Sequence, residues 1–296
     1  MSARPGNRYY AYSSARPHNH DPDYYNGDVG SVYFSDTKFL KLLGKSLSGQ
    51  LYFPSEVTSY TTDSLEMKTG WVRFAKEGFK VDVLGDLTID GTNTRLEMGG
   101  NKFPGGASYY FVRLFSGSIP WSLSVGGDMK VSGGALVRCF PSSTNGTDVA
   151  FGGYIDVGGT LTVTGRVNDC VSSLYLGCCP TNGGAVKVSA KNVYVASNAL
   201  VSAYLRGFQY GKGTSPYYSG NHQSQNGNLT TGAGHGGAGN NINSSSKNTY
   251  KPTAGRVYDD ELRPLMPGSA GYVNWNCDGT SPLCGGGVVY LKAKKK

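Results

Sequence analysis

A short unit recurs in the middle of the chain and constrains the fold more than any other feature. Its copies occupy residues 81–89, 123–131, 155–163 and, in weaker form, 186–195. Each copy reads as a short alternating strand, a tight and mostly Gly-containing corner, and a second alternating strand. Such a repeat predicts a coiled β-architecture in which each copy buries its apolar face against the next.

The composition agrees with an all-β fold. Of 296 residues, 44 are Gly and 21 are Tyr, and only 16% are charged. Glycine weakens helix interiors and tyrosine favours strands. No apolar run approaches the roughly 20 residues that a membrane helix needs, so we expect no membrane insertion.

The chain is basic, with a formal net charge of +8. A basic balance can indicate a nucleic-acid or anionic partner. Here Lys and Arg are dispersed along the chain, and the one dense cluster is the terminal set Lys292, Lys294, Lys295 and Lys296. We therefore interpret the charge as a scattered excess and expect no nucleic-acid partner.

Six cysteines are present: Cys139, Cys170, Cys178, Cys179, Cys277 and Cys284. An even count in a Gly- and Tyr-rich β-protein favours an oxidising compartment and disulfides. Cys277 and Cys284 flank a short turn, which predicts a local disulfide. A second candidate joins Cys170 to Cys178 or Cys179, and the full connectivity stays open. No CxxC pair or suitably spaced His indicates zinc.

The first residues lack the apolar segment of a signal peptide. A leader removed before residue 1, unconventional export and an intracellular protein all fit this observation. The cysteines favour the first alternative, which predicts an extracellular or cell-surface location.

The chain divides into four predicted segments. Residues 1–30 form an extended Tyr-rich arm, and residues 31–70 form an N-terminal cap region. Residues 71–207 carry the β-helix repeats, and residues 208–296 combine a Gly-rich loop segment with terminal strands. The best helix candidate spans residues 38–44, and we expect it to cover an open end of the coil.

Asp86 and Asp128 occupy the same position in successive copies of the repeat. Equivalent positions stack about 4.8 Å apart in such a coil. Two stacked carboxylates could hold Ca²⁺ through oxygen ligands, and no other cofactor is expected. The alternative is that each Asp builds its corner by accepting a backbone N–H. Thr160 in the third copy favours that alternative.

His235 lies among glycines, where a ligand could approach the backbone closely. A general base needs a partner that orients it, and the sequence places none beside His235. The alternative is a histidine that satisfies backbone groups in a Gly-rich turn. We therefore assign no catalytic residue.

Paired tyrosines stand in segments that look exposed. Exposed rings stack on sugars and are favoured at protein interfaces, although outward tyrosines can also simply line strands. The candidates for an interface or a ligand are Tyr9, Tyr10, Tyr24, Tyr25, Tyr217 and Tyr218.

Strand pairs joined at Gly-Asp corners resemble the right-handed parallel β-helices of pectate lyases, filamentous adhesins and phage tailspikes. Gly-rich stretches at 234–237, 267–271 and 285–291 resemble the ends of bacterial cell-surface β-helix proteins of the adhesin type. The resemblance implies a right-handed parallel β-helix. The chain lacks the lyase motif, so no lyase mechanism is implied.

The function expected from these observations is that of an extracellular structural or adhesive β-helix protein. It would self-associate through the N-terminal arm or the ends of the solenoid, or be displayed at a surface as a fibre, coat or adhesin subunit. The alternative is a polysaccharide-active lyase or hydrolase, or a glycan-binding module, on the same scaffold.

Overall fold

The computed structural model describes residues 31–45, 47–99, 119–142, 151–168, 170–176, 185–203 and 288–293. This part of the chain forms two sheets and one short 3-10 helix, η1 (Lys38–Leu42). Every strand pair in it except β13–β14 is parallel. The fold is therefore all-β with parallel sheets, as the sequence predicts.

One sheet has eight strands and the other has nine within the described residues. The eight-stranded sheet contains β1 (Ser31–Tyr33), β2 (Gly49–Tyr52), β5 (Gly70–Phe74), β8 (Thr94–Met98), β11 (Leu136–Cys139), β13 (Arg166–Val167), β14 (Cys170–Leu176) and β16 (Ala199–Ser202). The nine-stranded sheet contains β3 (Ser59–Thr62), β4 (Leu65–Met67), β6 (Lys80–Val83), β7 (Leu87–Asp90), β9 (Trp121–Val125), β10 (Met129–Ser132), β12 (Gly153–Val163), β15 (Val186–Val195) and β17 (Val289–Ala293).

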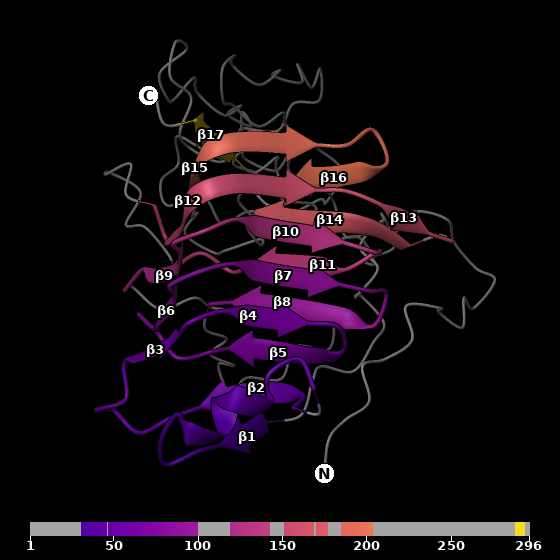
Figure 1. Ribbon diagram of the computed structural model, residues 1–296. Coiled ribbons are helices and arrows are strands. Elements are labelled where there is room, and N and C mark those ends of the chain that lie inside the picture. Colours follow the sequence, from indigo (N-terminus) through magenta and orange to yellow (C-terminus); the bar gives the residue numbers. More distant parts are fainter. Residues whose placement is uncertain are drawn as a thin grey trace, which may run out of the picture.

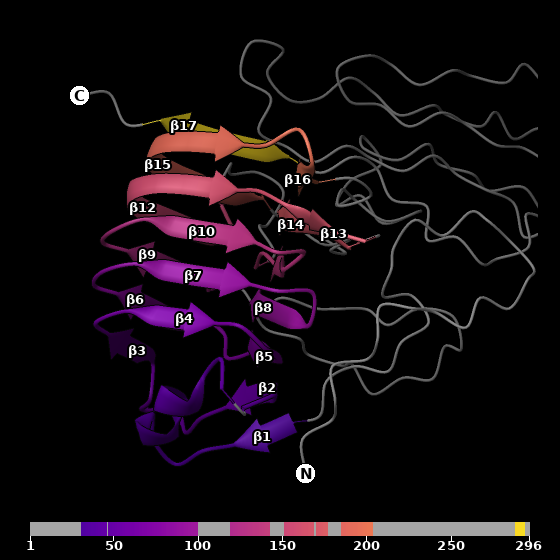
Figure 2. The same ribbon diagram turned by 45° about the vertical axis from the view of Figure 1, so that its right-hand side comes forward.

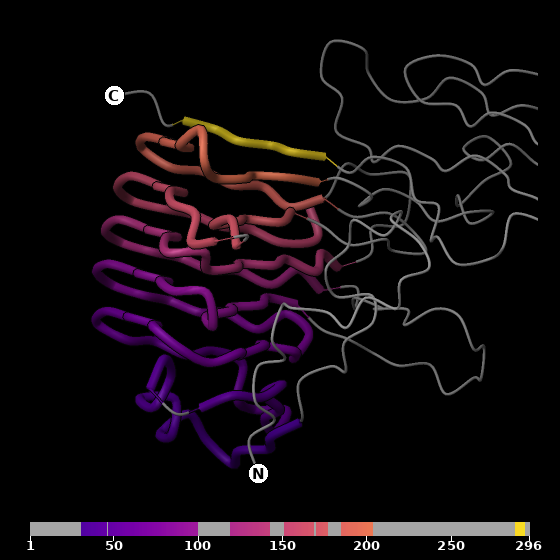
Figure 3. Tube along the Cα trace, turned by 90° about the vertical axis from the view of Figure 1, so that its right-hand side faces the viewer, coloured from indigo at the N-terminus to yellow at the C-terminus, as the bar shows by residue number. Residues whose placement is uncertain are grey.

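The chain passes back and forth between the two sheets. From β5 it crosses to β6 and β7 and returns to β8, which pairs with β5 in parallel. The next passage, through β9, β10 and β11, pairs strand for strand with this one. We call each passage a turn. Figures 1 and 2 show the turns as stacked levels, and the trace in Figure 3 shows them from the side.

Strand pairing aligns the repeated unit. Val81, Leu123 and Ile155 lie opposite one another in β6, β9 and β12, as predicted. The predicted start of the fourth copy is wrong by two residues, because Ile155 lies opposite Val188 and not Val186. The corner in β15 is one residue shorter than the corner in β12, which obscures this alignment in the sequence.

A further copy precedes those that the sequence shows. Tyr60 of β3 lies opposite Val81, and Leu65 of β4 lies opposite Leu87. The corner between β3 and β4 contains no glycine, which conceals the copy in the sequence. The stack thus begins before residue 71, and β2 and β5 already pair within it.

The core lies between the two sheets. Inward-facing positions are apolar in successive turns because each turn must bury its face on its neighbours. One column on the eight-stranded sheet is Val32, Leu51, Phe74, Met98, Cys139 and Leu176. The Phe79 ring stacks on Phe53 and on Phe74, with centroids 5.1 and 5.4 Å apart.

The predicted short helix is present as η1. Leu40 and Leu43 of this segment are buried and belong to the core cluster. Gly44 has a φ of +75°, and a Cβ on it would overlap the backbone of Glu66 in β4. The segment therefore packs against β4, and Figure 2 shows it at the same end of the stack as β1.

Candidate functional site

Asp86 and Asp128 lie at the corners of successive turns. The Asp128 N–H donates to Oδ1 of Asp86 at 2.8 Å, and the Thr160 N–H donates to Oδ1 of Asp128 at 2.7 Å. Thr160 accepts on its Oγ1 from Nδ2 of Asn192 at 3.4 Å. Each aspartate therefore holds the corner of the following turn through a backbone N–H.

The glycines of the corners leave room for these carboxylates. A Cβ on Gly127 would overlap Oδ1 of Asp86, and a Cβ on Gly159 would overlap Oδ1 of Asp128. An aspartate at the corner of one turn thus favours a glycine at the corner of the next, as at Gly127 and Gly159.

Calcium at Asp86 and Asp128 stays a prediction. Among the residues that the structure describes, no three His, Cys, Asp or Glu side chains come together. One oxygen of each carboxylate already accepts a backbone N–H. The described structure adds no further carboxylate to this pair.

Most other residues singled out in the sequence lie outside the described ranges, so their predicted roles stay predictions. These are His235, Tyr9, Tyr10, Tyr24, Tyr25, Tyr217, Tyr218, Cys178, Cys277 and Cys284.

Cys170 is a candidate of the sequence analysis that the structure does describe. Its thiol is free and buried, so the disulfide predicted for Cys170 is not formed in the structure. Its Cβ packs on the corner at Gly134 and would lie 3.0 Å from a Cβ added to that glycine. Cys139 is also a free, buried thiol and occupies an inward position of β11.

A row of polar and charged side chains crosses the outer face of the eight-stranded sheet. Gln50, Arg73, Glu97 and Arg138 lie opposite one another on β2, β5, β8 and β11. With Arg95 beside Glu97, we call this set the charged row. All five side chains are buried, and Glu97 is 0% exposed.

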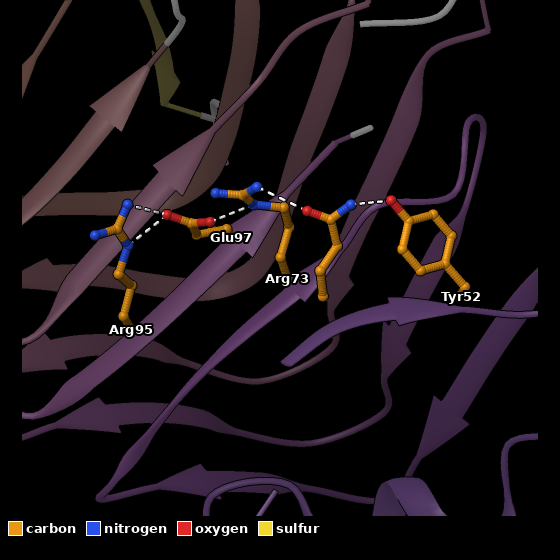
Figure 4. Close-up of polar contacts among 5 residues, drawn as sticks. Tyr52, Arg73, Arg95 and Glu97 are labelled. Carbon is orange, nitrogen blue, oxygen red and sulfur yellow. Dashed lines mark hydrogen bonds and ion pairs between the residues drawn. The ribbon is translucent and has the colours of Figure 1, made fainter. Parts of the chain in front are cut away.

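Four members of the charged row, Arg95, Glu97, Arg73 and Gln50, are joined in series. Arg73 and Arg95 each form an ion pair with Glu97, one to each carboxylate oxygen. Arg73 also donates to Oε1 of Gln50 at 2.9 Å, and Gln50 donates to the Tyr52 hydroxyl. Figure 4 shows this path from Arg95 through Glu97 and Arg73 to Tyr52.

Aromatic rings stack on the guanidinium groups of the row. The Arg95 guanidinium lies 4.1 Å from the centroid of Trp71, and that of Arg73 lies 5.0 Å from Phe140. Such contacts gain strength where water is excluded.

The charges of the row shift the pKa of Glu97 and contribute to the shifted pKa of Cys139. Burial opposes the charge on Glu97, but the guanidinium groups of Arg95, Arg73 and Arg138 together outweigh it and lower the pKa of Glu97. Burial, and then the negative charge of Glu97, raise the pKa of the Cys139 thiol. Glu97 is therefore the ionised centre of the row, and Cys139 is a neutral thiol.

The sequence analysis missed the charged row. Strict alternation places Arg73 on the face opposite Val72 and Phe74, and the structure agrees. Only the register of the turns shows that Glu97 falls between two arginines. The sequence signal that could have revealed the row is the opposite charge of Arg73 and Glu97 at equivalent positions of successive turns.

A polar hollow lies on the outer face of the nine-stranded sheet. It has a volume of about 270 Å³ and spans β9, β12 and β15. We call it the polar hollow; its lining consists of Ser122, Leu123, Ser124, Tyr154, Ile155, Asp156, Lys187 and Ser189. The serines of β9 are short, so the hollow opens beside the Tyr154 ring.

The C-terminal end of the stack exposes apolar side chains. Val289 and Leu291 of β17 continue inward-facing columns, yet they are 46% and 39% exposed. Val195 at the end of β15 also continues an inward column and is 39% exposed. In the described residues β17 pairs only with β15, and β16 only with β14.

Comparison of the chain with protein-family models, with curated proteins and with solved structures gives no match. The likeness to adhesin-type surface proteins therefore stays a prediction from the sequence. In the described part of the chain, no helix has the length and apolar character needed to cross a membrane.

Proposed function

We propose that this chain is a right-handed parallel β-helix that acts as a self-associating structural or adhesive unit outside the cell. Crossovers between parallel strands of one sheet are right-handed in about 98% of cases. The connection from β5 through β6 and β7 to β8 joins two parallel strands of one sheet. The general preference for right-handed connections therefore supports the proposed hand.

The observation that carries the proposal is the open C-terminal end. Inward-facing side chains are buried by the next turn, but Val289, Leu291 and Val195 have no further turn above them among the described residues. Exposed strand edges with apolar side chains favour pairing with another chain. A second copy of this chain supplies such an edge.

The two ends of the stack differ. At the N-terminal end, Leu40 and Leu43 of the η1 segment are buried in the core. The η1 segment covers only part of that end, where Phe39 and Leu42 stay 54% and 38% exposed. We take the C-terminal end as the better candidate for contact between copies, because Val289 and Leu291 continue the inward-facing columns of the stack. Residues 1–30 are the second proposed contact and would extend the assembly beyond a pair.

A charge at the open end tests the proposal. We expect the full chain to form oligomers and Leu291→Glu to weaken their association at least tenfold, because a carboxylate would be buried in an apolar contact. Light scattering over a dilution series measures the mass. Deletion of residues 1–30 should reduce assembly to smaller particles.

The matched control is Leu84→Glu. Leu84 is 63% exposed at a corner, away from the end of the stack, so this variant should assemble like the parent chain. A parent chain that is monomeric at all concentrations, or a Leu291→Glu variant that assembles like the control, would contradict the proposal.

The proposed extracellular location rests on the cysteine content. Cys139 and Cys170 are buried free thiols, so the proposal assigns disulfides to the other four cysteines. These are Cys178, Cys179, Cys277 and Cys284.

A further inference from the structure

We infer that the polar hollow is a binding site for a neutral saccharide, independent of any contact between copies. The inference rests on the shape of the hollow, on the chemistry of its lining and on the aromatic rings beside it.

The shape follows from the register of three strands. Ser122, Tyr154 and Lys187 lie opposite one another on β9, β12 and β15, and Ser124, Asp156 and Ser189 form the next outward row. Tyr154 is flanked on β9 by side chains much shorter than its own. The volume of about 270 Å³ is close to the lower limit of about 300 Å³ for small-ligand pockets, which suits one sugar ring.

The polar lining matches the hydroxyl groups of a sugar. The three serine hydroxyls both donate and accept hydrogen bonds, the Asp156 carboxylate accepts and the Lys187 ammonium donates. A ring that carries several hydroxyls needs both kinds of partner on one surface. One carboxylate and one ammonium balance in charge, so the lining favours a neutral ligand over a strongly acidic one.

One aromatic ring, that of Tyr154, lines the site, and further rings lie beside it. Tyr154 is 38% exposed and meets Phe151 edge to face at 6.1 Å between centroids. Phe151 also contacts Tyr290 at 5.1 Å, and Lys187 lies 5.9 Å from its centroid. Phe151 therefore holds the neighbouring side chains in place. The exposed part of the Tyr154 ring offers an amphipathic surface for the C–H face of a sugar.

The site crosses the strands, so a linear oligosaccharide would run along the stack. The outward position beside Ser122 on β6 is Lys80, and the one beyond Lys187 on β17 is Tyr290. Both could contact further sugar units. The proposed ligand class is therefore a neutral oligosaccharide, and each bound unit would make few contacts.

The experiment titrates the full chain with three hexasaccharides. One is built from glucose, one from N-acetylglucosamine and one from galacturonic acid. Calorimetry measures affinity, and saturation-transfer NMR reports which sugar protons contact the protein. We expect at least one neutral hexasaccharide to bind and to show transfer to its ring C–H protons.

Two variants locate the binding. Tyr154→Ala removes the stacking ring and should weaken binding roughly tenfold. Ser124→Tyr fills the hollow and should abolish it. Tyr194→Ala is the matched control, because Tyr194 is a 58% exposed tyrosine on the outer face of the same sheet. It should bind like the parent chain.

Three results would overturn the inference. They are the absence of binding by both neutral hexasaccharides at millimolar concentration, binding of the galacturonic acid hexasaccharide alone, and an equal effect of Tyr154→Ala and Tyr194→Ala. Circular dichroism of each variant verifies that the fold is intact.

Discussion

At the scale of single residues, successive turns are coupled through the space at their corners. Oδ1 of Asp86 occupies the position that a side chain at Gly127 would need, and it accepts the next backbone N–H. The same relation holds between Asp128 and Gly159. The identity of a residue in one turn therefore limits its neighbour in the next, although they lie far apart in the sequence.

This coupling predicts a non-additive pair of substitutions. Gly127→Ala should destabilise the protein by about 1–3 kcal/mol, because the new methyl group overlaps a carboxylate. The same change should cost less in an Asp86→Ala background, where the overlapping atom is absent. Denaturant unfolding of the four proteins in the cycle measures the coupling. Equal costs in both backgrounds would contradict this account of the corner.

Cys139 gives a second prediction at this scale. The thiolate is the reactive form of cysteine, and burial together with Glu97 raises the pKa of this thiol. Cys139 should therefore resist iodoacetamide at pH 8 in the native protein and react fully in denaturant. Peptide mass spectrometry reads the labelling at each cysteine. Rapid native labelling of Cys139 would show that β11 does not hold it in the core.

At the scale of elements, the charged row joins β2, β5 and β8 through hydrogen bonds and ion pairs, and Arg138 of β11 adds its charge beside Glu97. Each strand contributes one side chain at the same register position, and Glu97 receives an arginine from β5 and from its own strand. Removing one partner from a buried ion pair leaves the other charges uncompensated. The row therefore favours one register between β5 and β8.

We predict that Glu97→Gln lowers the free energy of unfolding by about 3–5 kcal/mol at pH 7. The pKa of Glu97 is lowered in the folded state. Its ionisation therefore stabilises the fold at pH values above the ordinary glutamate pKa of about 4.3. That contribution disappears as the pH falls through the lowered pKa. The variant should therefore lose less stability than the parent chain during acid titration.

Glu66→Gln serves as the control for this prediction. Glu66 pairs with Lys68 at 2.9 Å, but both side chains are mostly exposed, and exposed pairs contribute little. Chemical denaturation at a series of pH values compares the three proteins. Unchanged stability in Glu97→Gln, or an acid profile identical to that of the parent, would refute the structural role of the row.

At the scale of the whole molecule, the sequence predicted the stacking of turns but not their polar contacts. Glycine at the corners marked the turns that begin at Val81, Leu123 and Ile155, because a side chain there meets the previous turn. The sequence analysis missed the turn that begins at Tyr60 and the register of Val188. The corners that follow these two residues lack glycine, and each is one residue shorter than the corner it pairs with.

The candidate sites show the same division. The corner role of Asp86 and Asp128 followed from their equivalent positions, since it depends on the repeat alone. The polar hollow depends on which short and long side chains meet on β9 and β12, and the charged row depends on which charges meet on β5 and β8. Both require the exact register across turns, which alternation within one strand does not supply.

The position of β17 has a consequence for the order in which the molecule assembles. Leu291 lies opposite Val188, roughly 100 residues earlier, whereas Tyr60 and Val81 close a loop of only about 20. By sequence separation alone, each doubling of the length to be closed adds about 0.6 kcal/mol of closure entropy, so this closure costs about 1.4 kcal/mol more. The turns nearest the N-terminus can thus form early from nearby segments, and we expect β17 to dock late.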